Sequence, residues 1–163
     1  MKIAHELSTL NAVSPLDGRY ASRCDDLRAY LSEAGFMAHR VEVEVNWLIA
    51  LSEAGLPELP KFSEASKQTL QAIISDFSEA DAQRIKEIES VTNHDVKAVE
   101  YFLKEKISDD KNLADAAEFI HFACTSEDIN NTSHALMLSR VREQVVLPRL
   151  QKLQKKKKNY AHQ

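Results

Sequence analysis

The sequence predicts an all-α protein, because of where its glycines and prolines lie and how its apolar residues repeat. All three glycines and three of the four prolines fall within the first 60 of 163 residues, and Lys61 to Gln163 contains only Pro148. Such a stretch supplies neither a glycine-rich phosphate loop nor the tight turns of a β-sandwich. Apolar residues recur there at helical spacing instead. We therefore expect helices joined by polar turns.

Four of the expected helices begin with residues suited to cap them. Ser63 is expected to cap one helix, and Ser78 with Asp81 is typical of a capping box at the next. Asp95 is expected to cap a third, and residues 125–128 have the pattern of a fourth start. The predicted inner faces, beginning with an earlier helix around residues 41–49, are Val41, Val45, Leu48 and Ile49; Leu70, Ile73, Ile74 and Phe77; Ile85 and Ile88; Val96, Val99, Leu103 and Ile107; and Ile129, Ser133, Leu136, Met137 and Val141.

Residues 109–112 are a polar break at which we expect a domain boundary. The predicted domains are a small N-terminal helical domain, 1–111, and the beginning of a long-helix bundle domain, 112–163. A short helical run is expected over 114–124. Pro148 is expected to kink or end the long helix that follows, because proline lacks the N–H and clashes with the preceding turn. A long amphipathic helix needs neighbours, so we expect either an oligomer or a chain that stops inside a domain.

Composition limits the classes of protein to be considered. Charged residues make up 28% of the chain, and no apolar run approaches the roughly 18 residues that span a bilayer. Because the first residues are too polar for a secretory signal, we expect a cytoplasmic protein that contacts no membrane. The two cysteines lie a hundred positions apart, which favours reduced thiols over a disulfide.

After residue 148 the chain carries six basic side chains and no acidic one. Such an end could bind nucleic acid or an acidic membrane surface. No aromatic stacking platform accompanies these lysines, so we interpret them as a solvated helix face and expect no nucleic-acid partner.

Three segments place polar residues at helix beginnings, where free backbone N–H groups can hold anions. In the first, residues 14–20, a turn would project Arg19 and Tyr20, whose guanidinium and phenol suit phosphate or carboxylate. The alternative is a structural turn with an exposed arginine.

The second segment contains Asn93, His94 and Asp95. Either Asp95 caps the following helix and His94 is a loop residue, or the imidazole lies beside an anion site and can donate to a substrate oxygen or shuttle a proton.

The third segment runs from His121 to Asn131. Thr125 and Ser126 are adjacent hydroxyls at a helix start, where capping alone needs one, so together they suit a carboxylate. His121 and Cys124 are three apart, but no second ligand pair exists at a suitable spacing, and we expect no metal site.

These three segments, SPLDGRY (14–20), TNHDVKAVEYFL (92–103) and EFIHFACTSEDINN (118–131), resemble the adenylosuccinate lyase family of the fumarase/aspartase superfamily, and its bacterial branch in particular. The resemblance extends from about residue 7 to residue 162. It implies β-elimination of fumarate from adenylosuccinate, giving AMP, and from the related ribotide SAICAR in purine biosynthesis, with no cofactor. It also implies a homotetramer whose active sites each draw on three subunits.

The resemblance assigns Arg19 and Tyr20 to substrate binding near the phosphate, and Asn93, His94 and Asp95 to a second binding segment in which the histidine assists catalysis. It assigns Thr125 and Ser126 to the succinyl carboxylates. His121 matches a family histidine near the site; the other interpretation is a core histidine on a helix face.

The family's acid histidine belongs to a T-H-G-Q-P-A type block and its base serine to a G-S-S-x-M-P-x-K-x-N-P block. Neither block is present, since no glycine follows Gly55. The catalytic acid and base are therefore expected beyond Gln163. Argininosuccinate lyase, fumarase or aspartase is the nearest alternative, and a non-catalytic helical interaction module that uses its lysines is an alternative from another class.

The 163-residue chain alone is accordingly predicted to be inactive, because it contains only substrate-binding residues and neither the catalytic acid nor the catalytic base. Steady-state measurement of adenylosuccinate loss with the purified chain checks this prediction. Measurable turnover would contradict it.

Overall fold

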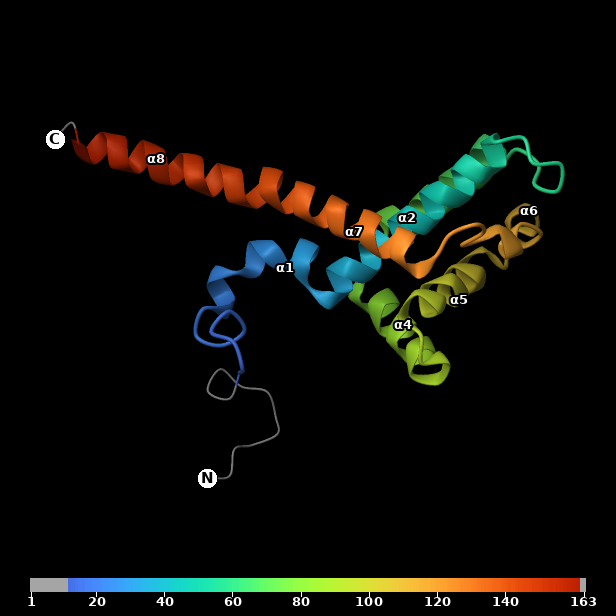
Figure 1. The fold of residues 1–163 in the computed structure, drawn as a ribbon, viewed down its shortest axis with the longest axis horizontal. Helices are drawn as coiled ribbons and strands as arrows, with labels where there is room; N and C mark the ends of the chain where they lie inside the picture. The colour runs from blue at the N-terminus through green and yellow to red at the C-terminus, as the bar shows by residue number, and fades with distance from the viewer. Residues whose placement is uncertain (1–11, 162–163) are drawn as a thin grey trace, which may run out of the picture. The chain divides into compact units, whose positions relative to one another are not determined.

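A computed structural model describes residues 12–161, and every regular element within that range is helical (Figure 1). This confirms the predicted all-α class. The polar beginning of the chain, residues 1–11, and residues 162–163 lie outside the described range. The elements are η1 (Ala21–Arg23), α1 (Asp25–Leu31), α2 (Glu33–Glu53), α3 (Glu64–Ser75), α4 (Glu79–Thr92), α5 (Asp95–Ile107), α6 (Lys111–Ala114), η2 (Ala117–Phe119), α7 (Ser126–Val141), the π-helical η3 (Arg142–Val146) and α8 (Leu147–Ala161).

The chain divides into a larger unit, residues 33–137, and a smaller unit that joins the segments before residue 33 and after residue 137. In the larger unit α2 packs against α3, α4 and α5, and α4 packs along α5 (Figure 1). Apart from Val96, which is buried outside it, the apolar residues predicted for the inner faces of these helices belong to one core or pack against it. Its most completely buried large side chains include Leu48, Leu59, Leu70, Ile85, Phe102, Leu103, Ile107 and Leu113.

Two of the three predicted caps in the larger unit's early helices are confirmed. Ser63 Oγ accepts from the backbone N–H of Ser66 at 3.1 Å at the start of α3. At the start of α4 a capping box forms, in which Asp81 Oδ2 accepts from the backbone N–H of Ser78 at 2.9 Å. The prediction that Asp95 caps α5 is wrong, because His94 occupies the cap position and Asp95 is the first residue of the helix.

The predicted helical run over residues 114–124 is also wrong. α6 ends at Ala114, a 3₁₀ turn follows, and then His121 (φ 64°) and Ala123 (φ 60°) adopt the left-handed conformation. Composition favours a helix here, but contacts to α2 hold the segment in another conformation. The polar break before it is confirmed, with Asp110 capping α6 through the N–H groups of Asn112 and Leu113. The domain boundary predicted at residue 111 stays a prediction.

In the smaller unit Pro148 does not end the helix, since α8 includes it. The preceding turn is π-helical, and the N–H of Leu147 donates to the carbonyl of Arg142 five residues earlier. A widened turn makes room for a proline ring that a regular α-helix would exclude. Arg149 of this unit forms an ion pair with Asp26. Among the described residues no helix is both long and apolar enough to cross a membrane.

Replacing Ser78 with alanine is expected to lower the free energy of unfolding by about 1 kcal/mol, because the capping box at α4 loses its hydroxyl. Urea denaturation of the chain, followed by circular dichroism, measures this. Ser90→Ala is the matched control, since Ser90 lies in the same helix and its hydroxyl donates only to the Glu87 carbonyl. Equal stability of Ser78→Ala and the control would contradict the prediction.

Candidate functional site

Arg40 of α2 joins the second and third predicted segments. Its side chain is only 6% exposed; Nη2 donates to Asp95 Oδ2 at 2.5 Å, and Nε donates to Asn130 Oδ1 at 2.9 Å. The guanidinium carbon lies 3.9 Å from the centroid of the Phe36 ring, and that ring stacks on His134 at 4.4 Å. Arg40 therefore connects both the beginning of α5 and the N-terminal part of α7 to α2.

His94 caps α5 with its ring. Nδ1 accepts from the backbone N–H of Lys97 at 3.1 Å, so the proton of the neutral ring is on Nε2. The side chain is 52% exposed, which leaves that Nε2–H available as a donor. Asn93, just before it, has φ 52° and ends α4 in the left-handed conformation that asparagine tolerates. This corrects the alternative in which His94 is only a loop residue.

Asp95 is held as a carboxylate. Partial burial opposes its ionisation, but the backbone N–H of Val96 and the charge and hydrogen bond of Arg40 outweigh that effect and lower the pKa of Asp95. Both carboxylate oxygens are engaged, Oδ1 by the N–H of Val96 and Oδ2 by Arg40. The side chain therefore positions the start of α5.

The start of α7 is capped without Ser126. Asp128 Oδ2 accepts from the backbone N–H of Thr125 at 2.7 Å and from its hydroxyl at 2.9 Å, and the same two donors lower the pKa of Asp128. Within the described part of the chain the Ser126 hydroxyl has no hydrogen-bond partner. That hydroxyl is the surplus donor at this helix beginning.

The turn before α7 is tied to α2 by two contacts. His121 Nδ1 lies 2.6 Å from Glu44 Oε1, and Trp47 Nε1 donates to the Phe122 carbonyl at 2.8 Å. His121 is therefore not on a helix face, as one interpretation of the sequence had it. Arg40 and Glu44 are site residues that the sequence analysis missed. Their spacing from Val41 and Leu48, which places both beside the apolar stripe of α2, was the available signal.

Cys124 lies close to the carboxyl group of Glu44. Burial, and then the negative charges of Glu44 and Asp128, raise the pKa of the Cys124 thiol. A protonated thiol is a poor metal ligand. No group of three or more histidine, cysteine or acidic side chains suited to a metal ion occurs in the range 12–161.

Arg19 and Tyr20 belong to the smaller unit, apart from the other predicted residues in this division of the chain. The predicted turn is confirmed, with the N–H of Gly18 donating to the Ser14 carbonyl at 3.0 Å and that of Tyr20 to the Pro15 carbonyl at 3.0 Å. Both side chains are exposed, and the Arg19 guanidinium lies 4.7 Å from the Tyr20 ring centroid. Arg19 has no acidic partner within the described residues, so its charge is available to a ligand.

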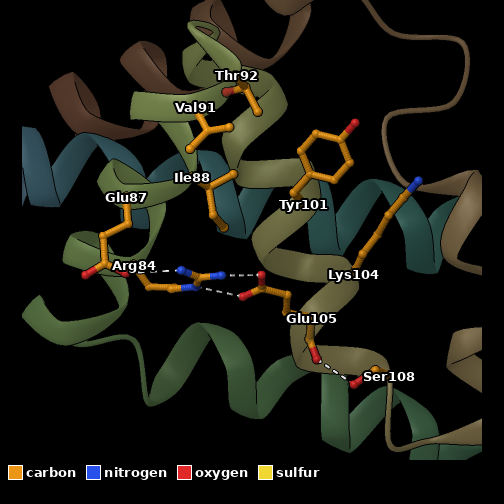
Figure 2. Close-up of a pocket in the computed structure, with 9 residues that line it drawn as sticks. All are labelled: Arg84, Glu87, Ile88, Val91, Thr92, Tyr101, Lys104, Glu105 and Ser108. Atoms are coloured by element: carbon orange, nitrogen blue, oxygen red, sulfur yellow. Dashed lines mark hydrogen bonds and ion pairs between the residues drawn. The ribbon is translucent and has the colours of Figure 1, made fainter.

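A groove of about 620 Å³ lies between α2 and α7 and includes Trp47, Cys124 and Asp128 in its lining. A second depression lies between α4 and α5 (Figure 2). There the Arg84 guanidinium donates to both oxygens of Glu105, at 3.0 and 2.7 Å, and Lys104 pairs with Glu118 at 2.9 Å. The cations of this second depression are neutralised by acids, so it is poorly suited to an anionic ligand.

Comparison with known proteins identifies relatives of this chain. A family model described as a lyase matches residues 18–163. The adenylosuccinate lyase of Haemophilus influenzae is 61% identical over 149 residues, which cover 91% of this chain and 33% of that protein. Those of Vibrio cholerae and Escherichia coli K12 are 58% and 57% identical, over 89% and 88% of this chain and 32% of each relative. The chain thus spans about a third of the length of these curated relatives.

Asp95→Asn is expected to lower the free energy of unfolding by about 1–3 kcal/mol at neutral pH, because Arg40 stays buried and loses its charged partner. The pKa of Asp95 is lowered in the folded state, so its stabilisation is complete above the unfolded pKa of about 4 and is lost as the pH falls through the lowered value. Urea denaturation of both proteins at neutral and acidic pH measures this. Asp109→Asn is the control, since Asp109 is exposed. A stability difference that persists unchanged at the lowest pH would contradict the assignment.

Proposed function

Since this chain belongs to the lyase family whose model matches residues 18–163, we propose that it forms the substrate-gripping part of an adenylosuccinate lyase. The observation that carries the proposal is the identity of 57–61% to three relatives that bear that name. The proposed activity is β-elimination of fumarate from adenylosuccinate and from SAICAR, as part of purine biosynthesis in the cytoplasm. Such relatives favour this activity over that of argininosuccinate lyase or another sister enzyme.

The anionic groups of these substrates suit the hydrogen-bond donors at the helix starts that capping does not use. A base removes a proton next to a carboxylate, the carbon–nitrogen bond breaks, and an acid protonates the departing nitrogen. Negative charge accumulates on the succinyl carboxylate during this step, so donors that already point at it lower the barrier. In our proposal Thr125 and Ser126 hold that end of the substrate, Ser126 directly through its free hydroxyl and Thr125 indirectly, because its hydroxyl already donates to Asp128. Neither the proton-removing base nor the acid is assigned to this chain.

The remaining predicted residues take supporting roles in the proposal. Arg19 and Tyr20 bind near the phosphate, where an unpaired guanidinium offers a forked set of donors. His94 presents Nε2–H to a substrate oxygen and assists catalysis, with Asn93 beside it. Asp95 acts on substrate indirectly, because its carboxylate is taken up by Arg40.

We also propose that the protein is a homotetramer. On α8, which has no buried residue, Leu147, Leu150 and Leu153 are 40%, 54% and 52% exposed. These residues recur at helical spacing and give a lysine-rich helix one apolar face, which is a feature of helices that pack against other helices.

The proposal is tested with a chimera in which this chain replaces the matching third of the E. coli adenylosuccinate lyase. We expect the chimera to cleave adenylosuccinate, and the reaction is monitored by the change in the absorbance of adenylosuccinate. Ser126→Ala is expected to lower kcat/KM by about 10- to 100-fold, the loss expected from one hydrogen bond to a charged group, roughly 1.5–3 kcal/mol.

Ser139→Ala is the matched control, because Ser139 is an exposed serine of the same helix and should leave kcat/KM unchanged. A chimera that has the size and helix content of the E. coli enzyme but no activity would contradict the proposed function. Equal activity of Ser126→Ala and the control would remove Ser126 from the binding site.

A further inference from the structure

Glu44 is a buried acid to which the proposed reaction gives no role. Its side chain is 0% exposed, and Oε2 has no hydrogen-bond partner among the described residues. Burial raises the pKa of Glu44, His121 acts in the opposite direction, and the nearby charge of Glu100 raises it further. A buried carboxyl group with a free oxygen is costly for stability, so a packing role alone would be better served by an apolar residue.

The other oxygen of Glu44 contacts a strained turn. Oε1 lies 2.6 Å from Nδ1 of His121, and His121 and Ala123 both have positive φ, at 64° and 60°. A residue with a side chain in this region costs on the order of 1–3 kcal/mol and persists only when its surroundings hold it there. Phe122 lies between His121 and Ala123 in the sequence. Its carbonyl accepts a hydrogen bond from Trp47 Nε1, one turn along α2 from Glu44.

The turn directly precedes Thr125 and Ser126, the two hydroxyl residues of the proposed site. Thr125 follows Cys124, whose N–H donates to the His121 carbonyl at 3.2 Å, and α7 begins at Ser126. The conformation of His121 to Ala123 therefore sets where the first N–H groups of α7 and the Ser126 hydroxyl lie. A displacement of about 1 Å in such groups can cost on the order of 100-fold in rate.

We propose that Glu44 is a positioning residue: its buried carboxyl group holds the imidazole of His121 through Nδ1, fixes the strained turn before α7, and leaves Nε2 of His121 as the nitrogen that faces the ligand. The proposal rests on the proposed function for the identity of that ligand. The hydrogen bond and the strained turn themselves do not depend on it.

The proposal also assigns the tautomer of the histidine. With the Glu44 carboxylate as the acceptor, His121 donates through Nδ1, so the neutral ring has an Nδ1–H and an unprotonated Nε2. His94 has the opposite arrangement, because its Nδ1 accepts from a backbone N–H. The site then offers one imidazole as a donor and one as an acceptor.

Glu100 is the natural comparison for Glu44. It is also a buried glutamate, but Lys97 contacts its Oε2 at 2.7 Å and Lys104 its Oε1 at 3.2 Å, so both oxygens are paired. No described contact joins Glu100 to the turn before α7. Its substitution therefore reports the effect of removing a buried acid that makes no contact with His121. Because the charge of Glu100 raises the pKa of Glu44, its loss is expected only to favour the Glu44 carboxylate further.

The test uses the 163-residue chain with Glu44→Leu, Glu44→Gln and the control Glu100→Leu. Nitrogen-15 NMR of the His121 ring is expected to show the Nδ1–H form in the parent chain, in Glu44→Gln, whose amide oxygen accepts the same proton, and in the control. Glu44→Leu is expected to shift the ring to the Nε2–H form and to speed amide hydrogen exchange over residues 121–126 by about tenfold or more.

An unchanged His121 tautomer and unchanged exchange over residues 121–126 in Glu44→Leu would overturn the proposal. If circular dichroism shows that Glu44→Leu is unfolded, Glu44→Asp takes its place. That variant keeps a buried acid but withdraws it from Nδ1 by one methylene, and the same two changes are expected.

A second arm separates this proposal from the function itself. In the chimera, Glu44→Leu is expected to raise KM about 10- to 100-fold and Glu44→Gln to restore it to near the parent value. NMR and exchange changes together with an inactive parent chimera would refute the lyase assignment and leave the positioning role of Glu44 intact. An active chimera whose KM does not respond to Glu44→Leu would refute the positioning role and leave the lyase assignment intact.

Discussion

Arg40 carries a permanent positive charge inside the larger unit, and a charge removed from water must be paired. Its two hydrogen bonds go to Asp95 at the start of α5 and to Asn130 near the start of α7. Segments that are 35 residues apart along the chain are thereby fastened to one side chain of α2. If either partner moved, the guanidinium would be left buried with an unsatisfied donor, so this requirement fixes where the two helices begin. The groups proposed to grip substrate depend on that placement.

α2 combines two tasks that are usually separate. Val41, Val45 and Leu48 contribute to the core. On the flank of the same stripe, Arg40 contacts the first residue of α5 and Glu44 contacts the turn before α7. A rigid 21-residue helix is a more precise support for a ligand site than a loop. The strain at His121 and Ala123 is tolerable because side chains of this helix hold the turn from outside.

The two helix starts also show how capping distributes polar groups. At α7 the N–H and hydroxyl of Thr125 are satisfied by Asp128, and at α5 the N–H of Lys97 is satisfied by the ring of His94. Each cap leaves a donor available beside it, the hydroxyl of Ser126 at α7 and the Nε2–H of His94 at α5. Local backbone chemistry thus prepares donors before any ligand is present.

The sequence by itself determined the all-α class, the apolar faces, two of the helix caps and the three polar segments, because these depend on neighbours a few positions away. Periodicity and capping are local properties, and Ser63 and Ser78 reveal them directly. Tertiary structure decided the rest: that His94 and not Asp95 caps α5, that residues 121–123 leave the helical conformation, and that a π turn accommodates Pro148. In the first two cases the contacting partner on α2, Arg40 or Glu44, is more than fifty residues away. Satisfying a buried polar group competes there with a local preference, and no short window of sequence contains both partners.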